Sequence, residues 1–143
     1  AFNSGVKGLD AEARKAARKV EAGASFLMTQ PVYDIETANK VLDLLEPLKV
    51  RVFVGVMPLV SERNAEFLHN EVPGITIPEH VRARMKGKSG PAGREEGLKI
   101  ASELVEGFAR RSKSVYLITP MDRYGMIAEL IRIIRSIASS ITT

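Results

Sequence analysis

The sequence contains no cysteine among its 143 residues. This absence excludes disulfide bonds, thiolate metal sites and cysteine nucleophiles, and it is compatible with a reducing cytosol without requiring one. No apolar run approaches the roughly 20 residues of a membrane-spanning helix. The N-terminus also lacks the basic, apolar and cleavage regions of a signal peptide. We therefore expect a cytoplasmic protein without a membrane segment.

The charge of the chain does not indicate a nucleic-acid-binding protein. Lysine and arginine number 21 against 17 aspartate and glutamate residues, which gives a net charge of +4. The excess is scattered among helix-like segments and does not form a basic tail or an aromatic-interleaved patch. With 45% hydrophobic residues, the chain is long enough for one globular domain, or part of one, with a real core.

Apolar residues recur with two different patterns, one typical of helices and one of buried strands. Helices are predicted over about residues 10–23, 35–45, 61–70, 78–85 and 94–110, and a last helix begins at residue 122 or 123 and ends near residue 138. Short apolar segments predict strands over residues 25–30, 50–57 and 114–119. Such segments suit parallel strands that are buried on both faces. Residues 1–3 read as the end of a further strand.

Three local signals refine this assignment. Asp10 can cap the first helix, and Ser61 has the place of a cap at the start of the third. Residues 86–93 are rich in glycine but lack the spacing of a phosphate-binding loop and lie between two predicted helices. This segment is therefore predicted to be a flexible connection.

The strict alternation of strands and helices predicts an α/β fold with a parallel sheet. Four strand–helix units cannot close a barrel of eight, so the sheet is either a small open sheet or half of a (β/α)8 TIM barrel. Periodicity alone does not choose between these two. The chain begins at Ala1, without an initiator methionine and inside a predicted strand end, which is typical of a trimmed or truncated chain.

Polar residues follow each predicted strand, where ligands gather in parallel α/β proteins. Each of them also suits turn geometry or helix capping. Gln30 stands out because a neutral amide that donates and accepts hydrogen bonds can read the edge of a pterin or flavin ring. Arg123 could pair with a carboxylate such as a glutamate tail, or could form a surface ion pair of little energetic weight.

The other polar candidates have plainer explanations. Arg18 and Lys19 suit a phosphate group, but cations also commonly end helices because they complement the helix dipole. His69 and His80 have no partners at the spacing of a metal motif, and Ser61 has no partner pattern for a nucleophile. We expect no metal site.

Four segments resemble methylenetetrahydrofolate reductases. They are residues 18–24 (RKVEAGA), 28–34 (MTQPVYD), 54–58 (VGVMP) and 61–74 (SERNAEFLHNEVPG). The stretch from Asn64 to Gly74 is especially similar to the reductase module fused to homocysteine S-methyltransferases in bacterial bifunctional proteins. The resemblance extends from Ala1 to about Ile134, in the same order and at compatible spacings.

The resemblance implies a TIM-barrel flavoprotein of one-carbon metabolism and methionine biosynthesis. Such an enzyme uses NADH or NADPH to reduce FAD and then reduces 5,10-methylenetetrahydrofolate to 5-methyltetrahydrofolate. Residues 1–143 would form strands five to eight, the C-terminal part of a single barrel domain. The family's catalytic acid and the aspartate near the flavin lie on the N-terminal strands, so the resemblance implies no catalytic residue here and an inactive chain when alone.

The resemblance also assigns binding residues. The expected folate-side residues are Gln30, which would also contact the nicotinamide, Asn64 and Arg123. The expected FAD-binding residues are Phe2, Glu12, Lys15, Arg18 and Lys19. The segment between Phe2 and Asp10 is shorter than in the enterobacterial-type enzymes and lacks their histidine, so one flavin contact of the family has no counterpart in this chain.

Two interpretations follow for the chain as a whole. In the first it is a fragment of the reductase. In the second it is a non-catalytic α/β module for flavin binding or assembly that completes a barrel with another chain. Both predict a homo-oligomer or association with the missing barrel half, because an isolated half-barrel exposes strand edges and apolar surface.

Overall fold

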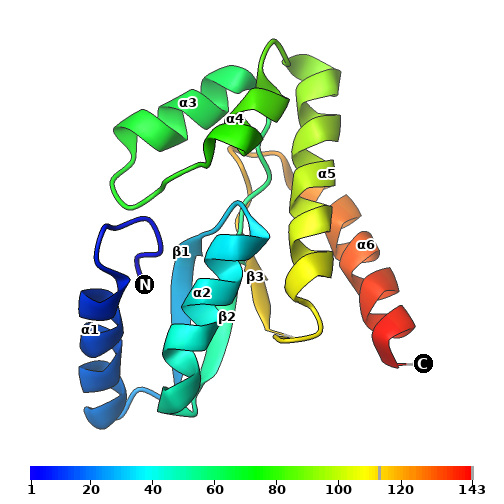
Figure 1. The fold of residues 1–143 in the computed structure, drawn as a ribbon. Coiled ribbons are helices and arrows are strands. Elements are labelled where there is room, and N and C mark those ends of the chain that lie inside the picture. Colours follow the sequence, from blue (N-terminus) through cyan, green and yellow to red (C-terminus); the bar gives the residue numbers. More distant parts are fainter. Residues whose placement is uncertain (113, 143) are drawn as a thin grey trace.

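The computed structural model describes residues 1–112 and 114–142 (Figure 1). Strands and helices alternate as the sequence predicts. The elements are α1 (Leu9–Glu21), β1 (Phe26–Pro31), α2 (Ile35–Leu45), the 3-10 helix η1 (Glu46–Leu48), β2 (Arg51–Val56), α3 (Glu62–Glu71), α4 (Glu79–Met85), α5 (Gly90–Phe108), β3 (Val115–Leu117) and α6 (Tyr124–Thr142).

The strands form a parallel sheet in the order β1-β2-β3. Phe2 adds a parallel bridge to Thr29 on the outer side of β1, which agrees with the prediction that residues 1–3 end a strand. The Phe2 amide donates to the Met28 carbonyl and the Gln30 amide donates to the Phe2 carbonyl, each at 2.7 Å. The predicted α/β class with a parallel sheet is therefore confirmed.

One face of the sheet is packed against helices. Val54 and Val56 of β2 form a buried cluster with Leu104 and Phe108 of α5 and Leu130 of α6. A second cluster joins α1, α2, β1 and Phe2. In Figure 1, α2 lies in front of the strands, α5 stands to the right of β3, and α6 packs beside α5. This face is the main core of the protein.

The other face carries apolar side chains that remain accessible. Phe26 is 52% exposed and Met28 is 38% exposed. Phe53 packs edge-to-face on Phe26 with ring centroids 5.7 Å apart, and Tyr116 of β3 lies over Gly55 of β2. We call this surface, made by Phe26, Met28, Phe53 and Tyr116, the exposed sheet face.

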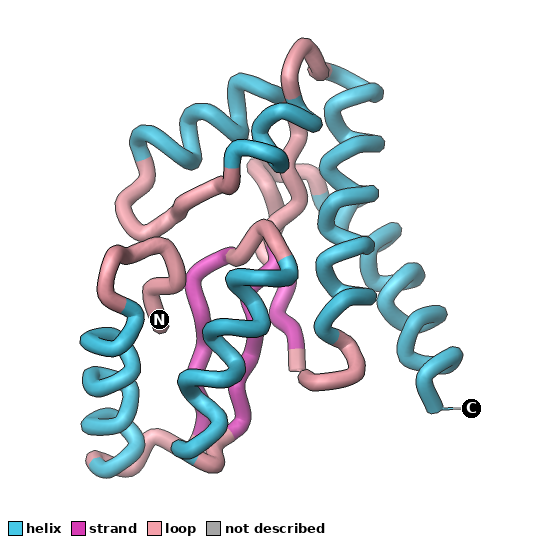
Figure 2. The backbone as a smooth tube through the Cα atoms, in the orientation of Figure 1, coloured by secondary structure: helices cyan, strands magenta, loops and turns pink. Residues whose placement is uncertain are grey.

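Helices α3 and α4 lie beyond the carboxyl ends of the strands, where the connecting loops also gather (Figure 2). They enclose a separate apolar cluster that includes Tyr33, Leu59, Leu68, Ile77 and Met85. The segment from β2 to α3 thus crosses the carboxyl end of the sheet, where we expect a ligand to bind.

Glycines of α5 set how closely this segment approaches the helix. A Cβ atom on Gly93 would lie 2.2 Å from the Val60 carbonyl oxygen, and one on Gly97 would lie 1.7 Å from the Leu59 carbonyl oxygen. The predicted flexible connection over residues 86–93 is therefore wrong in its second half. Gly90 to Gly93 form the first turn of α5, with Pro91 at a position that suits a helix start. Gly93 is the residue of this turn that lies against the Val60 carbonyl.

Two other local predictions meet different outcomes. The predicted cap Asp10 is wrong, because α1 begins at Leu9 with Gly8 in the cap position and no side-chain cap. Asp10 instead lies in the first turn, where a carboxylate still complements the helix dipole. Ser61 is confirmed as a cap, since its hydroxyl oxygen accepts a hydrogen bond from the Asn64 amide at 3.1 Å.

Across residues 1–112 and 114–142, no helix combines the length and the apolar character needed to cross a bilayer.

Candidate functional site

The strongest irregularity of the sheet lies at the carboxyl end of β1. Met28 pairs with Phe53 and Pro31 pairs with Gly55, so two residues of β1, Thr29 and Gln30, stand opposite the single residue Val54. Such a bulge bends a strand and changes the direction of its side chains. The bulge therefore sets the position of Gln30, the residue that the sequence indicates most clearly as a ligand-binding residue.

Thr29 holds the bulge from within the sheet. Its side chain is fully buried. The hydroxyl oxygen accepts a hydrogen bond from the Gly55 amide at 2.9 Å and donates one to the Gln30 carbonyl at 2.7 Å. A buried side chain thus replaces part of the regular ladder between β1 and β2.

The Gln30 side chain is half-buried. Its backbone amide is bonded to Phe2, but its side-chain amide forms no hydrogen bond with any residue that the structure describes. Both the carbonyl oxygen and the amino group of this side chain are free to meet a ligand.

Asn64 lies in the first turn of α3 and already has a structural role. Its side-chain oxygen accepts a hydrogen bond from the Val60 amide at 3.2 Å, which ties the helix to the β2–α3 segment. The amino group of the side chain remains available as a donor. Asn64 can therefore contribute one hydrogen bond to a ligand at the carboxyl end of the sheet.

Arg123 is exposed and immediately precedes α6. It lines a cleft of about 730 Å³ between the first half of α5 and the start of α6, together with Arg94 and Asp122. Within the described chain neither arginine has an ion-pair partner. Arg94 was not singled out by the sequence, because its position in a long amphipathic helix gives no sign of a shared cleft.

The candidates on α1 lie together with Phe2. Glu12, Lys15 and Lys19 share one face of the helix, and with Phe2 they line a hollow of about 250 Å³ beside β1. Lys15 Nζ lies 2.7 Å from Glu12 Oε1, and this hydrogen bond lowers the pKa of Glu12. Arg18 is exposed and is not among the residues that line the hollow.

The charged side chains that line this hollow suit a ligand with a phosphate group next to a hydroxyl group. Two ammonium groups stand against one carboxylate, so the lining has a net positive charge that can attract a phosphate group. Glu12 Oε2 also accepts a weak hydrogen bond from the Asn3 amide at 3.4 Å. A carboxylate held in this way can accept a hydrogen bond from a ribose hydroxyl.

The candidate residues fall into two groups, one that lines the hollow beside α1 and one at the carboxyl ends of the strands. Phe2 connects them, because it lines the hollow beside α1 and is bonded through its backbone to Gln30. Gln30 lies at the carboxyl end of β1, and Asn64 and Arg123 follow β2 and β3 along the chain. No hydrogen bond joins their side chains in the described structure. A ligand would have to bridge them.

Of the other polar groups, one has a structural role and two are buried without a partner in the described chain. His69 Nδ1 accepts a hydrogen bond from the Ile77 amide at 3.1 Å, so this histidine fastens the α3–α4 connection. The Tyr33 hydroxyl and Arg82 Nε are buried without a hydrogen-bond partner in the described chain. Within the same residues, no three His, Asp or Glu side chains gather closely enough to hold a metal ion.

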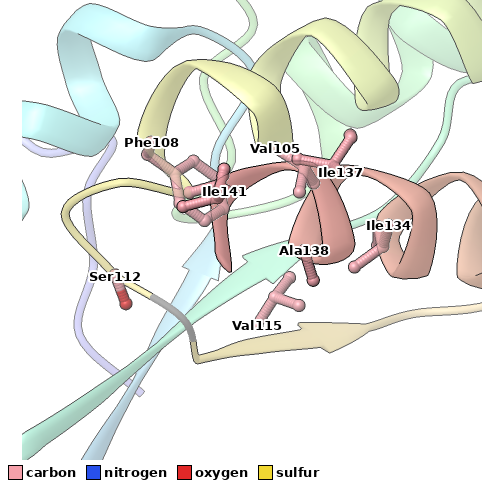
Figure 3. Close-up of a pocket in the computed structure, with 9 residues that line it drawn as sticks. Val105, Phe108, Ser112, Val115, Ile134, Ile137, Ala138 and Ile141 are labelled. Carbon is pink, nitrogen blue, oxygen red and sulfur yellow. The ribbon is translucent and has the colours of Figure 1, made fainter. Parts of the chain in front are cut away.

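A further pocket lies at the opposite, amino end of β3. Figure 3 shows side chains of α5, α6 and β3 around it, among them Phe108, Ile134, Ile137 and Val115. Its volume is about 90 Å³, and Ser112 supplies the polar side chain of its lining. Because it offers so few polar groups to orient a ligand, we regard it as a packing gap between α5 and α6.

The chain is similar to known proteins both in sequence and in fold. A sequence profile described as methylenetetrahydrofolate reductase matches residues 2–135. A search of curated proteins gave no match. Among solved structures, the chain is similar to an uncharacterized protein from Clostridium thermocellum described as binding two copies of 5-methyl-5,6,7,8-tetrahydrofolic acid. The TM-score is 0.57 at 19% sequence identity, and the match covers 90% of this chain but 48% of that one. The chain therefore spans about half the length of that structure.

Proposed function

Because the chain belongs to the methylenetetrahydrofolate reductase family, we propose that it is the C-terminal half of a flavin-dependent enzyme of that activity. In this proposal the complete enzyme reduces 5,10-methylenetetrahydrofolate to 5-methyltetrahydrofolate with NADH or NADPH. The observation that carries the proposal furthest is the half-buried Gln30 amide, which is unpartnered in the described structure and is presented by a bulge at the carboxyl end of a parallel strand.

The half-barrel part of the proposal rests on the sheet. Three parallel strands and the Phe2 bridge form a sheet with helices on one face and accessible Phe26 and Met28 on the other. In a closed (β/α)8 barrel, that second face is the packed interior. Strands five to eight, contributed by residues 1–143, would leave strands one to four to complete the barrel and cover this face.

The folate part rests on three side chains at the carboxyl ends of the strands. Gln30 can donate to and accept from the edge of a pterin ring, and the Asn64 amino group can donate a further hydrogen bond. Arg123 carries a guanidinium without an ion-pair partner in the described residues, which suits the carboxylates of a glutamate tail. A solved protein of similar fold is described as binding 5-methyltetrahydrofolate, which agrees with this ligand class.

The hollow beside α1 fits part of FAD. Lys15 and Lys19 would hold the pyrophosphate, Glu12 would accept a hydrogen bond from the ribose, and Phe2 would lie against the flavin. Arg18, on the neighbouring face of the helix, would add positive charge without entering the hollow. FAD, when bound, supplies the hydride carrier between the pyridine nucleotide and the folate.

Gln30 suits a site that two substrates occupy in turn. Its amide can bond a nicotinamide carboxamide as well as a pterin, because both present donors and acceptors at a ring edge. Opening the methylene bridge of the folate also requires a general acid. The resemblance assigns no carboxylate of this chain to that role, so the proton donor would come from the N-terminal half, and this chain alone would be inactive.

The exposed sheet face also favours a second candidate. A non-catalytic module that binds flavin or assists assembly, and completes its barrel with another chain, would bury the same Phe26 and Met28 side chains. The two candidates differ in turnover, since only a reductase oxidises NADH or NADPH in a folate-dependent reaction.

The proposal is tested by Gln30→Glu in the flavin-containing protein. A carboxylate keeps the size of the side chain but loses its donor, so we expect folate turnover to fall by about tenfold or more while flavin affinity stays within twofold. Asn70→Asp makes the same chemical change on an exposed residue of α3 and should leave both unchanged. An unaltered folate half-reaction in Gln30→Glu would remove Gln30 from the site.

A further inference from the structure

Tyr116 crosses the exposed sheet face from β3 to β1. Its hydroxyl donates a hydrogen bond to the Thr29 carbonyl, so the side chain spans the whole width of β2. The ring passes over Gly55, where an added Cβ atom would lie 2.8 Å from the Tyr116 hydroxyl oxygen and 3.0 Å from the ring. A side chain at residue 55 would therefore push the Tyr116 ring away, and glycine there lets Tyr116 lie close to the sheet and reach Thr29.

The Thr29 carbonyl belongs to the bulge that presents Gln30. In that bulge the Gly55 amide donates to the Thr29 hydroxyl, the Thr29 hydroxyl donates to the Gln30 carbonyl, and the Gln30 amide donates to the Phe2 carbonyl. Together with the Tyr116 bond, these contacts fix the peptide groups on both sides of Gln30. Tyr116 is the member of this network that comes from outside β1, β2 and Phe2.

The phenol is well suited to a permanent structural bond. A tyrosine hydroxyl is protonated at neutral pH at its ordinary pKa, and burial raises the pKa of Tyr116 further, so the hydroxyl can donate throughout the neutral range. An aromatic ring has two rotatable torsions and loses less freedom on ordering than a long flexible chain would. A hydrogen bond supplied by such a side chain can hold a bulge in one geometry.

We propose that Tyr116 is a positioning residue that holds the Thr29–Gln30 bulge so that the Gln30 amide meets the folate ring. This inference rests on the proposed function, because it assigns to Tyr116 a role in the affinity of the same site. Tyr116 acts through Gln30 and Thr29 and need not touch the ligand.

The test is Tyr116→Phe in the flavin-containing protein, because phenylalanine keeps the ring over Gly55 and removes the hydroxyl alone. We expect the dissociation constant for 5-methyltetrahydrofolate to rise by about threefold to tenfold, the range for the loss of one hydrogen bond. Flavin affinity should stay within twofold. Tyr33→Phe is the matched control, since it removes a buried hydroxyl that has no hydrogen-bond partner in the described chain.

A second measurement separates this inference from the proposed function. Amide hydrogen exchange at Gln30, followed without folate, should be faster in Tyr116→Phe by about threefold to tenfold and unchanged in Tyr33→Phe. If exchange is faster but the wild-type protein binds no folate, the positioning of Gln30 stands and the proposed function fails. If the wild-type protein binds folate and Tyr116→Phe alters neither exchange nor affinity, the positioning role of Tyr116 is wrong.

Discussion

At the carboxyl end of β1 the backbone around Gln30 is fully engaged, whereas its side-chain amide has no partner among the described residues. This combination follows from Thr29, whose buried hydroxyl accepts a hydrogen bond from the Gly55 amide of β2 and donates one to the Gln30 carbonyl of its own strand. A fixed backbone beneath a free polar group suits a binding site, because the backbone then loses no freedom when the ligand arrives and only the side-chain torsions have to be ordered.

Gln30 and Arg123 were identifiable from the sequence because they follow predicted strands. Tyr116 was not, because its role depends on a contact between residues 87 positions apart and on the missing side chain of Gly55. Thr29 offered a weak signal, a hydroxyl residue inside an apolar strand. Sequence periodicity describes which face a residue occupies but not which backbone group its side chain reaches.

Tyr33→Phe is also expected to affect stability. The Tyr33 hydroxyl is buried without a hydrogen-bond partner in the described residues, and burial raises its pKa. Because an unsatisfied buried hydroxyl costs free energy, phenylalanine should raise the free energy of unfolding by about 1 kcal/mol. Urea denaturation of the two proteins measures the difference. A loss of 1 kcal/mol or more would mean that the hydroxyl is bonded within the fold.

The helices and strands follow closely from the apolar pattern, and α2 occupies the predicted range of residues 35–45. The errors arise where a distant contact overrides local composition. Residues 90–93 are predicted to be a flexible connection, but they are the start of α5, with Pro91 in the first turn and Gly93 against the Val60 carbonyl. At α1 the helix begins at Leu9, and its cap position lies two residues before the expected cap Asp10, at Gly8 with a φ of 106°, a conformation that favours glycine.

The packing of α5 against the β2–α3 segment yields a prediction for Gly97→Ala. The new Cβ atom would lie 1.7 Å from the Leu59 carbonyl oxygen, so the helix or the segment must move. We expect the free energy of unfolding to fall by about 1–3 kcal/mol, as for other overpacked sites, and folate affinity to fall because Asn64 is tied to Val60.

Gly125→Ala is the matched control for this change. Gly125 lies in the first turn of α6 and has no atom within 4 Å of an added Cβ. Alanine there should leave stability unchanged or raise it slightly, because it is the better helix former. Equal stability of Gly97→Ala and the wild-type protein in thermal unfolding would show that α5 does not press on Leu59.

For the whole molecule, the consequence of the fold is a sheet with one face packed and one face accessible. The exposed sheet face carries Phe26 at 52% exposure and Met28 at 38%. Accessible apolar surface of this kind promotes association. The chain produced without a partner is therefore expected to self-associate, and a protein that supplies the remaining strands should bury this face.

A charged substitution on this face tests that expectation. Phe26→Lys should reduce self-association of the chain, measured as average mass by analytical ultracentrifugation, because burying an unpaired charge in the interface is costly. Ile131→Lys is the control, since Ile131 is a partly exposed apolar residue of α6, with 37% exposure. Equal effects of the two substitutions would show that association does not depend on the exposed sheet face.

The central claim, that this chain is half of a flavin-dependent reductase, is tested most directly by the native protein itself. Its mass should be near twice the 15.7 kDa of this chain, as expected for a complete barrel domain. It should also show flavin absorbance and oxidise NADH or NADPH in a reaction that depends on folate. A native protein of 15.7 kDa that carries no flavin and shows no folate-dependent oxidation would contradict the account.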